Sequence, residues 1–166
     1  EFLQIDYNYL YNEIDKLNIN TIDIRNIMEL KDYYETDTHW RQEKLHKVIK
    51  EMSKTMNFNY QDIQYKENTY NEFYGVYYGE SAINRKPESI IYLTNNDLDN
   101  LTVDYLENEN LHTVYNLDNL TSLDSYEVYL DGASSFIEIY NDNSISNKEL
   151  VIFRDSFGSS LTPLLT

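Results

Sequence analysis

Ser156 stands at the junction of two contrasting patterns. Residues 150–153 are a continuous apolar run of strand length, and a turn with two charges separates them from an apolar pattern of helical period. The sequence therefore predicts a strand, a tight turn and a helix. Such a turn presents a serine beside the first N–H groups of a helix, which can stabilise an oxyanion. Ser156 is thus a candidate nucleophile, whereas Ser134 and Ser135 lack this setting.

A serine nucleophile needs a base that takes its proton and a third group that holds the base. His39 lies two residues after Asp37. In a loop, this spacing can bring the carboxylate to one ring nitrogen and leave the other nitrogen facing Ser156. His46 and His112 have no acidic residue at this spacing. The residues therefore indicate Asp37, His39 and Ser156 as a candidate triad.

Two segments carry a family resemblance. The first reads Y-E-T-D-T-H-W over residues 34–40, and the second reads R-D-S-F-G over residues 154–158. In this order they resemble the DHHW-motif proteins, which belong to the alginate O-acetyltransferase-like branch of the SGNH-hydrolase superfamily. F-Y-G at residues 73–75, Y-L-D-G at residues 129–132 and residues 137–141 also look like family segments, so the resemblance runs from residue 22 to the end. Thr38 departs from the motif, which usually has a histidine there.

The resemblance implies catalytic roles for Ser156, His39 and Asp37. Contacts to the substrate or the oxyanion are assigned to Arg154, Gly132, Tyr74 and Trp40. The implied activity is O-acetyl transfer to a bacterial exopolysaccharide or cell-envelope glycan, without a metal or nucleotide cofactor. Proteins of this group act outside the cytoplasm, at the cell surface or membrane, beside a membrane-bound O-acyltransferase that delivers the acetyl group. A carbohydrate acetyl esterase with the same triad and a non-catalytic glycan-binding scaffold remain open alternatives.

The composition of the chain excludes several classes of partner and metal site. Thirteen Lys and Arg against 29 Asp and Glu give a net charge of −16, which repels nucleic acid and anionic lipid, so we expect no nucleic-acid partner. The chain has no cysteine, which excludes disulfides and thiolate zinc sites. The acidic group of Asp97, Asp99 and Asp104 lacks the glycine and final glutamate of a calcium loop. Coding from an AT-rich genome explains the number of tyrosines, 17, which also fill protein cores, and sugar stacking by exposed tyrosines is the alternative.

Periodicity predicts the elements that would position the triad. Helical patterns cover residues 3–17, 25–31, 41–56 and the segment after Ser156, and strand-like runs cover residues 22–24, 89–93, 111–117, 126–130, 136–140 and 150–153. Residues 57–70 and 95–110 are predicted to be irregular. This alternation predicts an α/β layered fold with a mainly parallel sheet. The resemblance implies that the sheet belongs to an SGNH-hydrolase-like (flavodoxin-like) three-layer sandwich. We expect residues 1–166 to be a single catalytic domain and a fragment that lacks terminal strands and continues beyond both ends.

Overall fold

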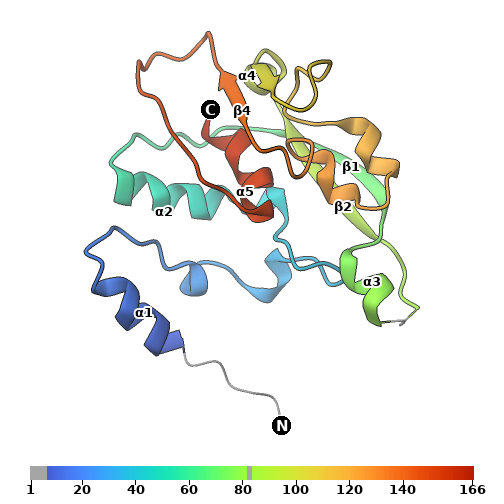
Figure 1. Cartoon of the computed structure of the whole chain (residues 1–166), viewed down its shortest axis with the longest axis horizontal. Coiled ribbons are helices and arrows are strands. Elements are labelled where there is room, and N and C mark those ends of the chain that lie inside the picture. Colours follow the sequence, from blue (N-terminus) through green and yellow to red (C-terminus); the bar gives the residue numbers. More distant parts are fainter. Residues whose placement is uncertain (1–6, 82–83) are drawn as a thin grey trace.

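Within the described part of the chain, the β-structure consists of two small antiparallel sheets (Figure 1). The structure is a computed structural model that describes residues 7–81 and 84–166. β1 (Lys66–Phe73) pairs with β2 (Glu88–Thr94), and β3 (Thr102–Tyr105) pairs with β4 (Ile137–Tyr140). The predicted mainly parallel, three-layer SGNH-type sandwich is therefore wrong.

The error arises because an apolar run does not specify its partner strand. Residues 111–117 and 126–130 were predicted as strands, but they share only the isolated bridge between Tyr115 and Tyr129. Residues 150–153 make no backbone hydrogen bond to another described residue. In contrast, β3 forms within a segment predicted to be irregular and β1 begins in another, because pairing and burial of alternate side chains outweigh their polar composition.

The helices agree better with the periodicity. α1 (Tyr7–Asp15) falls within the predicted helix at residues 3–17, whose first four residues lie outside the described part of the chain. α2 (His46–Met56) and α5 (Ser156–Leu161) also form where helices were predicted. The other α-helices are α3 (Val76–Ser81) and α4 (Asn96–Asp99). The 3₁₀ helices are Ile24–Asn26, Leu30–Asp32, Gln42–Lys44, Leu117–Thr121, Ser125–Val128 and Thr162–Leu165.

α2 is amphipathic and has a defined C-terminal end. Val48 and Ile49 are buried on one face, while Lys50 and Lys54 are exposed and Lys47 is half-buried against Asp32. Asn57 ends the helix in the left-handed conformation, with φ of 54°, which asparagine tolerates better than most residues. The Phe58 N–H then donates to the Ser53 carbonyl at 3.1 Å and satisfies one of the terminal acceptors.

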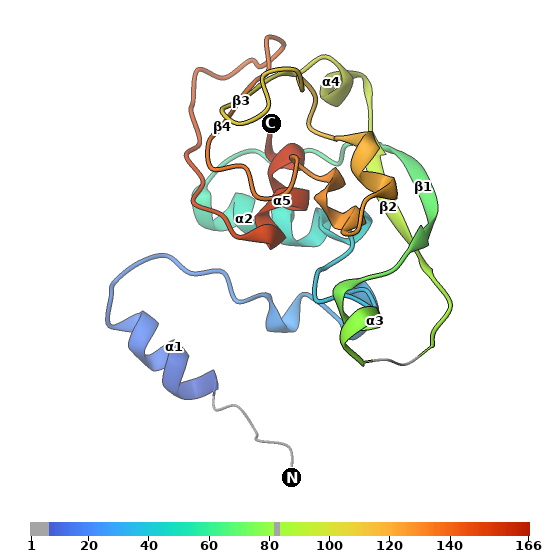
Figure 2. The same ribbon diagram turned by 45° about the vertical axis from the view of Figure 1, so that its right-hand side comes forward.

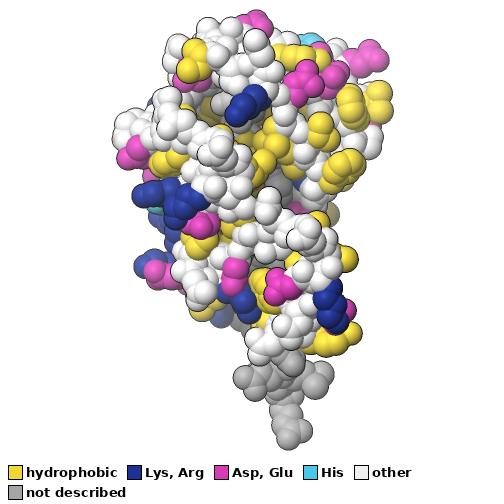
Figure 3. All heavy atoms as spheres, turned by 90° about the vertical axis from the view of Figure 1, so that its left-hand side faces the viewer, with side chains coloured by type: hydrophobic (Ala, Val, Ile, Leu, Met, Phe, Trp, Pro, Cys, Tyr) yellow, Lys and Arg dark blue, Asp and Glu magenta, His cyan; other side chains and the backbone are white. Residues whose placement is uncertain are grey.

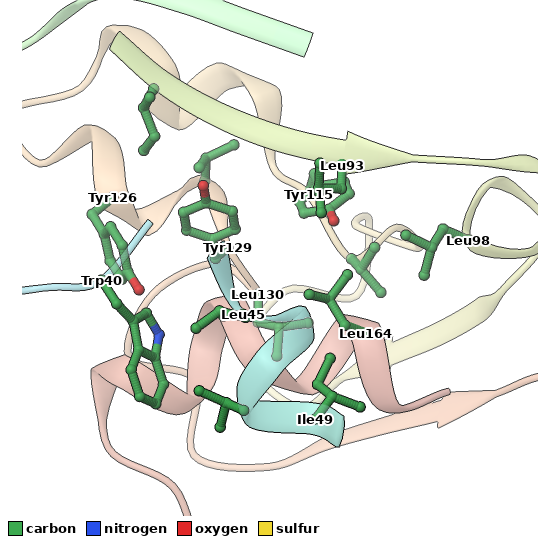
Figure 4. Close-up of a cluster of buried hydrophobic side chains, with 14 of the residues drawn as sticks. Trp40, Leu45, Ile49, Leu93, Leu98, Tyr115, Tyr126, Tyr129, Leu130 and Leu164 are labelled. Atoms are coloured by element: carbon green, nitrogen blue, oxygen red, sulfur yellow. The ribbon is translucent and has the colours of Figure 1, made fainter. Parts of the chain in front are cut away.

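The hydrophobic core lies between α2, β2 and α5 (Figure 4). Leu45, Ile90 and Tyr129 are fully buried in it. Four further tyrosines are buried there: Tyr34, Tyr105, Tyr115 and Tyr126. This packing places the α5 helix beside the residues that follow the Asp37 loop.

α1 stands apart from the rest of the chain in both ribbon views (Figures 1 and 2). None of its residues is buried. The Arg25 guanidinium lies 3.8 Å from the centre of the Tyr11 ring and pairs with Asp23 at 2.7 Å, which links the helix to the chain that follows it. Among the described residues, no helix has the length and apolar character needed to cross a bilayer.

Hydrophobic side chains also appear on the surface. Figure 3 faces the left-hand side of Figure 1 and shows them scattered between charged groups. Val151 and Phe153 are 77% and 98% exposed, and their run, which was predicted as a strand, has no strand conformation. The segment before Ser156 is therefore irregular, and it has no strand partner among the described residues.

Candidate active site

Asp37 and His39 lie in one tight loop. The loop is closed by a bridge between Tyr33 and Trp40, and the Tyr34 N–H donates to the His39 carbonyl at 3.1 Å. Asp37 Oδ1 accepts from the His39 backbone N–H at 2.9 Å and lies 2.5 Å from His39 Nδ1. Because Asp37 and His39 are only two positions apart, a local turn of the backbone brings the carboxylate to the ring nitrogen.

Ser156 completes a chain of hydrogen bonds, here called the triad. It is the first residue of α5, and its Oγ lies 2.7 Å from His39 Nε2 although the residues are 117 positions apart. Since Nδ1–H donates to the carboxylate, Nε2 is the acceptor for the Ser156 hydroxyl proton. His39 is buried, whereas Ser156 is exposed to solvent. The structure thus brings the three predicted residues together in the predicted order, while their catalytic role remains a prediction.

Asp37 is held as a carboxylate inside the protein. Its side chain is fully buried, and burial by itself would raise its pKa. Hydrogen bonds from the His39 ring, the His39 N–H and the Val76 N–H outweigh this effect and lower the pKa of Asp37 below its usual value. The carboxylate is therefore charged at neutral pH and keeps the His39 ring in one orientation.

The start of α3 supports the Asp37 loop through backbone groups. The Val76 N–H donates to Asp37 Oδ2 at 3.0 Å, and the Tyr77 N–H donates to the Thr36 carbonyl at 3.0 Å. The Gly75 N–H donates to Thr36 Oγ1 at 3.2 Å. A Cβ atom at Gly75 would lie 2.2 Å from the Thr36 carbonyl oxygen, so only glycine fits this contact. The resemblance marked residues 73–75, but nothing in the sequence indicated these three hydrogen bonds.

A second support comes from β2. The Glu88 carboxylate accepts from the Thr36 N–H and the Thr36 hydroxyl, both at 2.7 Å, and from the Glu35 N–H at 3.0 Å. It also pairs with the Arg41 guanidinium at 2.7 Å, and both side chains are largely buried. Sequence reasoning missed this pair because the two residues are 47 positions apart and belong to no recognised motif.

Aromatic rings enclose His39. The Tyr126 ring stacks on the imidazole, with centroids 3.8 Å apart and planes at 9°, and the Phe157 ring lies 4.9 Å away. Tyr126 was not predicted as a site residue, since only its distance from His39 in the fold distinguishes it from the other tyrosines. Figure 4 shows Tyr126 beside Trp40 at one end of the core.

Trp40 and Tyr74, two of the predicted substrate contacts, differ in setting. Trp40 is buried, and its indole N–H donates to Ser160 Oγ at 2.9 Å and to the Phe157 carbonyl at 3.1 Å. Its contacts therefore join the His39 loop to α5. Tyr74 is 44% exposed and packs edge-on against Tyr78 at 4.8 Å, just before the segment that binds Asp37.

Arg154 and Gly132, the predicted oxyanion contacts, are bonded to each other. Arg154 Nη2 donates to the Gly132 carbonyl at 3.1 Å, and its Nη1 donates to Ser159 Oγ at 2.5 Å. The single N–H of Gly132 is used by the Tyr129 carbonyl at 3.2 Å. A guanidinium has five N–H donors, so Arg154 keeps donors beyond these two bonds and Gly132 has none left.

The remaining candidates lie outside the triad. Thr38, the departure from the motif, is exposed. Ser135 bonds Glu107, and His112 bonds the Val103 carbonyl. The described residues contain no group of three or more His, Cys, Asp or Glu side chains that could hold a metal ion. An open hollow of about 570 Å³ lies beside the Asp37 loop. Arg41 and Glu88 line this hollow, whereas Ser156 does not.

Comparison with known proteins supports the resemblance at the level of fold. No protein-family model matches the chain, and no curated protein matches it either. A crystal structure of a DHHW family protein from Eubacterium siraeum DSM 15702 is similar, with a TM-score of 0.67 and 20% sequence identity. The chain shares the fold of a DHHW family protein. The match covers 80% of this chain but only 46% of that one, so the chain spans less than half the length of this neighbour.

Proposed function

We propose that the chain transfers acetyl groups to a bacterial exopolysaccharide or cell-envelope glycan through an acyl-enzyme on Ser156. The observation that carries this proposal is the unbroken hydrogen-bond chain from the buried Asp37 through His39 to the exposed Ser156, with contacts of 2.5 Å and 2.7 Å. A serine, a base and a carboxylate at these distances are the parts that activated-serine chemistry requires. The choice of an acetyl group and a glycan as the substrates rests on the DHHW resemblance.

The first half-reaction forms the acyl-enzyme. Ser156 Oγ attacks the carbonyl carbon of an acetyl ester while its proton passes to His39 Nε2. The tetrahedral intermediate collapses, the ester C–O bond breaks, and the leaving alcohol takes the proton from Nε2. Asp37 remains ionised throughout and stabilises the imidazolium that forms between the two proton transfers.

The second half-reaction releases the acetyl group. A sugar hydroxyl gives its proton to His39 Nε2 and attacks the acetyl carbon, and Ser156 leaves with that proton. Water in place of the sugar gives hydrolysis. The exposure of Ser156 favours an acetyl esterase as the second candidate, because transfer requires that the acceptor exclude water from the acyl-enzyme.

The oxyanion needs donors close to Ser156. The Ser156 N–H has no hydrogen-bond partner among the described residues, and we assign it as the first donor. Arg154 is the better second donor, since Gly132 has spent its only N–H on the Tyr129 carbonyl. Arg154 also packs against the first turn of α5, because a Cβ atom added at Gly158 would lie 2.5 Å from Arg154 Cβ. The Arg154 side chain therefore starts close to Ser156, the first residue of that turn.

The wider context is also part of the proposal. We place the protein outside the cytoplasm of a bacterium, at the cell surface or membrane, where a membrane-bound O-acyltransferase delivers the acetyl group. The net charge of −16 suits a neutral or cationic glycan better than a polyanion.

The test is covalent labelling of Ser156. The protein is mixed with para-nitrophenyl acetate, quenched, and its intact mass and peptide map are measured. We expect an acetyl adduct on Ser156 that Ser156→Ala and His39→Ala abolish, while Ser135→Ala retains it as a matched serine control. A folded protein without an adduct and without ester turnover would refute the acyl-enzyme and favour a glycan-binding scaffold.

A further inference from the structure

Tyr126 presents a flat surface to the base of the triad. Its ring is buried and lies parallel to the His39 imidazole, with centroids 3.8 Å apart and an angle of 9° between planes. The imidazole must keep both nitrogens in line with their partners, Asp37 on one side and Ser156 on the other. A tilt of the ring lengthens both contacts at once, and a parallel neighbour resists that tilt by steric contact.

The hydroxyl of Tyr126 anchors this surface to the helix of the nucleophile. It lies 2.8 Å from Ser160 Oγ, and Ser160 is one helical turn beyond Ser156 in α5. Ser160 is fully buried and also accepts from the Trp40 indole at 2.9 Å. Trp40 directly follows His39, so Ser160 is bonded both to the stacked ring and to the loop that carries the base.

The donors and acceptors at Ser160 balance. A hydroxyl has one proton and two lone pairs. The Ser160 proton goes to the Phe157 carbonyl at 3.4 Å, the Trp40 indole can only donate, and Tyr126 therefore donates into the second lone pair. Burial raises the pKa of Tyr126 well above its usual value, so the phenol keeps the proton that this bond needs.

We propose that Tyr126 is a positioning residue of the active site: its ring fixes the plane of the His39 imidazole, and its bond to Ser160 fixes that plane relative to Ser156. This inference rests on the proposed acyl-transfer function. The ring has a second effect during turnover, because the positive charge that His39 acquires lies over the electron-rich face of the phenol.

The test compares variants that keep or remove the flat ring. Tyr126→Phe keeps the ring and loses the anchor, whereas Tyr126→Leu removes the ring. With para-nitrophenyl acetate we expect Tyr126→Leu to lower kcat about 10- to 100-fold without raising KM, because a displaced base slows the reaction while binding is unchanged. Tyr126→Phe lowers kcat less than Tyr126→Leu does, and its remaining loss measures the contribution of the bond to Ser160. Tyr65→Leu is the control, since Tyr65 is half-buried against the core beside Tyr60 and Asp97 and touches no residue of the triad, so this variant keeps the wild-type kcat.

A spectroscopic measurement separates this inference from the proposed function. Protons of a ring stacked on a phenol are shielded, so Tyr126→Leu moves the His39 ring signals downfield in the NMR spectrum and Tyr126→Phe leaves them in place. If the wild type shows no turnover, the proposed function fails, and the NMR shift still tests the stacking. Tyr126→Met, which fills the space without a flat face, replaces the leucine variant if that one does not fold. Unchanged kcat and His39 signals without the ring, or equal losses in the phenylalanine and leucine variants, would overturn the inference.

Discussion

Gly75→Ala tests how closely the triad depends on the α3 segment. The added Cβ would lie 2.2 Å from the Thr36 carbonyl oxygen and 2.4 Å from Asp37 Cβ. Both neighbours belong to the loop that holds the base, and neither is the end of a flexible side chain. Since non-bonded carbon contacts are comfortable near 3.5 Å, one side has to move by roughly 1 Å.

That displacement predicts two measurable losses. A shift of about 1 Å in a catalytic group can cost about 100-fold in rate, so we expect Gly75→Ala to slow Ser156 acetylation by one to two orders of magnitude. Overpacking of a filled site costs about 1–3 kcal/mol of stability, read from urea unfolding. The rate is compared under conditions where circular dichroism shows the variant to be folded.

Gly79→Ala, four residues further on and inside α3, is the matched control. A Cβ at Gly79 meets nothing within 4 Å. Alanine is favoured over glycine in a helix by about 0.5–1 kcal/mol, so this variant should be slightly more stable than wild type and equally reactive. A folded Gly75→Ala protein that acetylates Ser156 at the wild-type rate would refute the argument that Gly75 positions the Asp37 loop.

Two further predictions concern the supports of the loop. Because the pKa of Asp37 is lowered in the folded state, Asp37 contributes stability that is present above its unfolded pKa of about 4 and is lost as pH falls through its folded value. Urea unfolding between pH 7 and pH 2 should show this loss, and Asp37→Asn should flatten the dependence of unfolding free energy on pH. Identical pH dependence in the two proteins would contradict the lowered pKa of Asp37. Glu88→Gln leaves the Arg41 charge without its partner and should cost about 1–3 kcal/mol of unfolding free energy. Glu35→Gln removes only an exposed ion pair with Arg85 and should change stability by less than about 0.5 kcal/mol, so equal effects of the two substitutions would show that Glu88 is not a support.

Local chemistry explains which elements could be predicted. Apolar residues recur in α2 with the 3.6-residue period of a helix that buries one face. The sequence therefore predicted a helix at the position where α2 forms. The strand-like runs gave a wrong fold class, because a strand forms only where another segment offers unpaired backbone groups. Residues 150–153 have the composition of a buried strand and no such neighbour among the described residues, whereas the polar β1 has one in β2.

The supports of the candidate site were beyond sequence reasoning for a related reason. Tyr126, Ser160 and Glu88 are ordinary residues with no spacing that relates them to the motif. They act through contacts with residues 34 or more positions away, such as the bond between Tyr126 and Ser160. Only the fold decides which of many tyrosines, serines and glutamates make such contacts.

The sequence by itself determined the short-range half of the candidate site. The two-residue spacing of Asp37 and His39 places a carboxylate on a ring nitrogen within one loop, and Asp155 caps the helix that begins at Ser156. Tertiary structure alone decided that the two halves meet, with Ser156 Oγ at 2.7 Å from His39 Nε2 across 117 residues. The reason is physical: hydrogen bonds between near neighbours follow from backbone geometry, whereas a contact between distant segments depends on how the core packs between them.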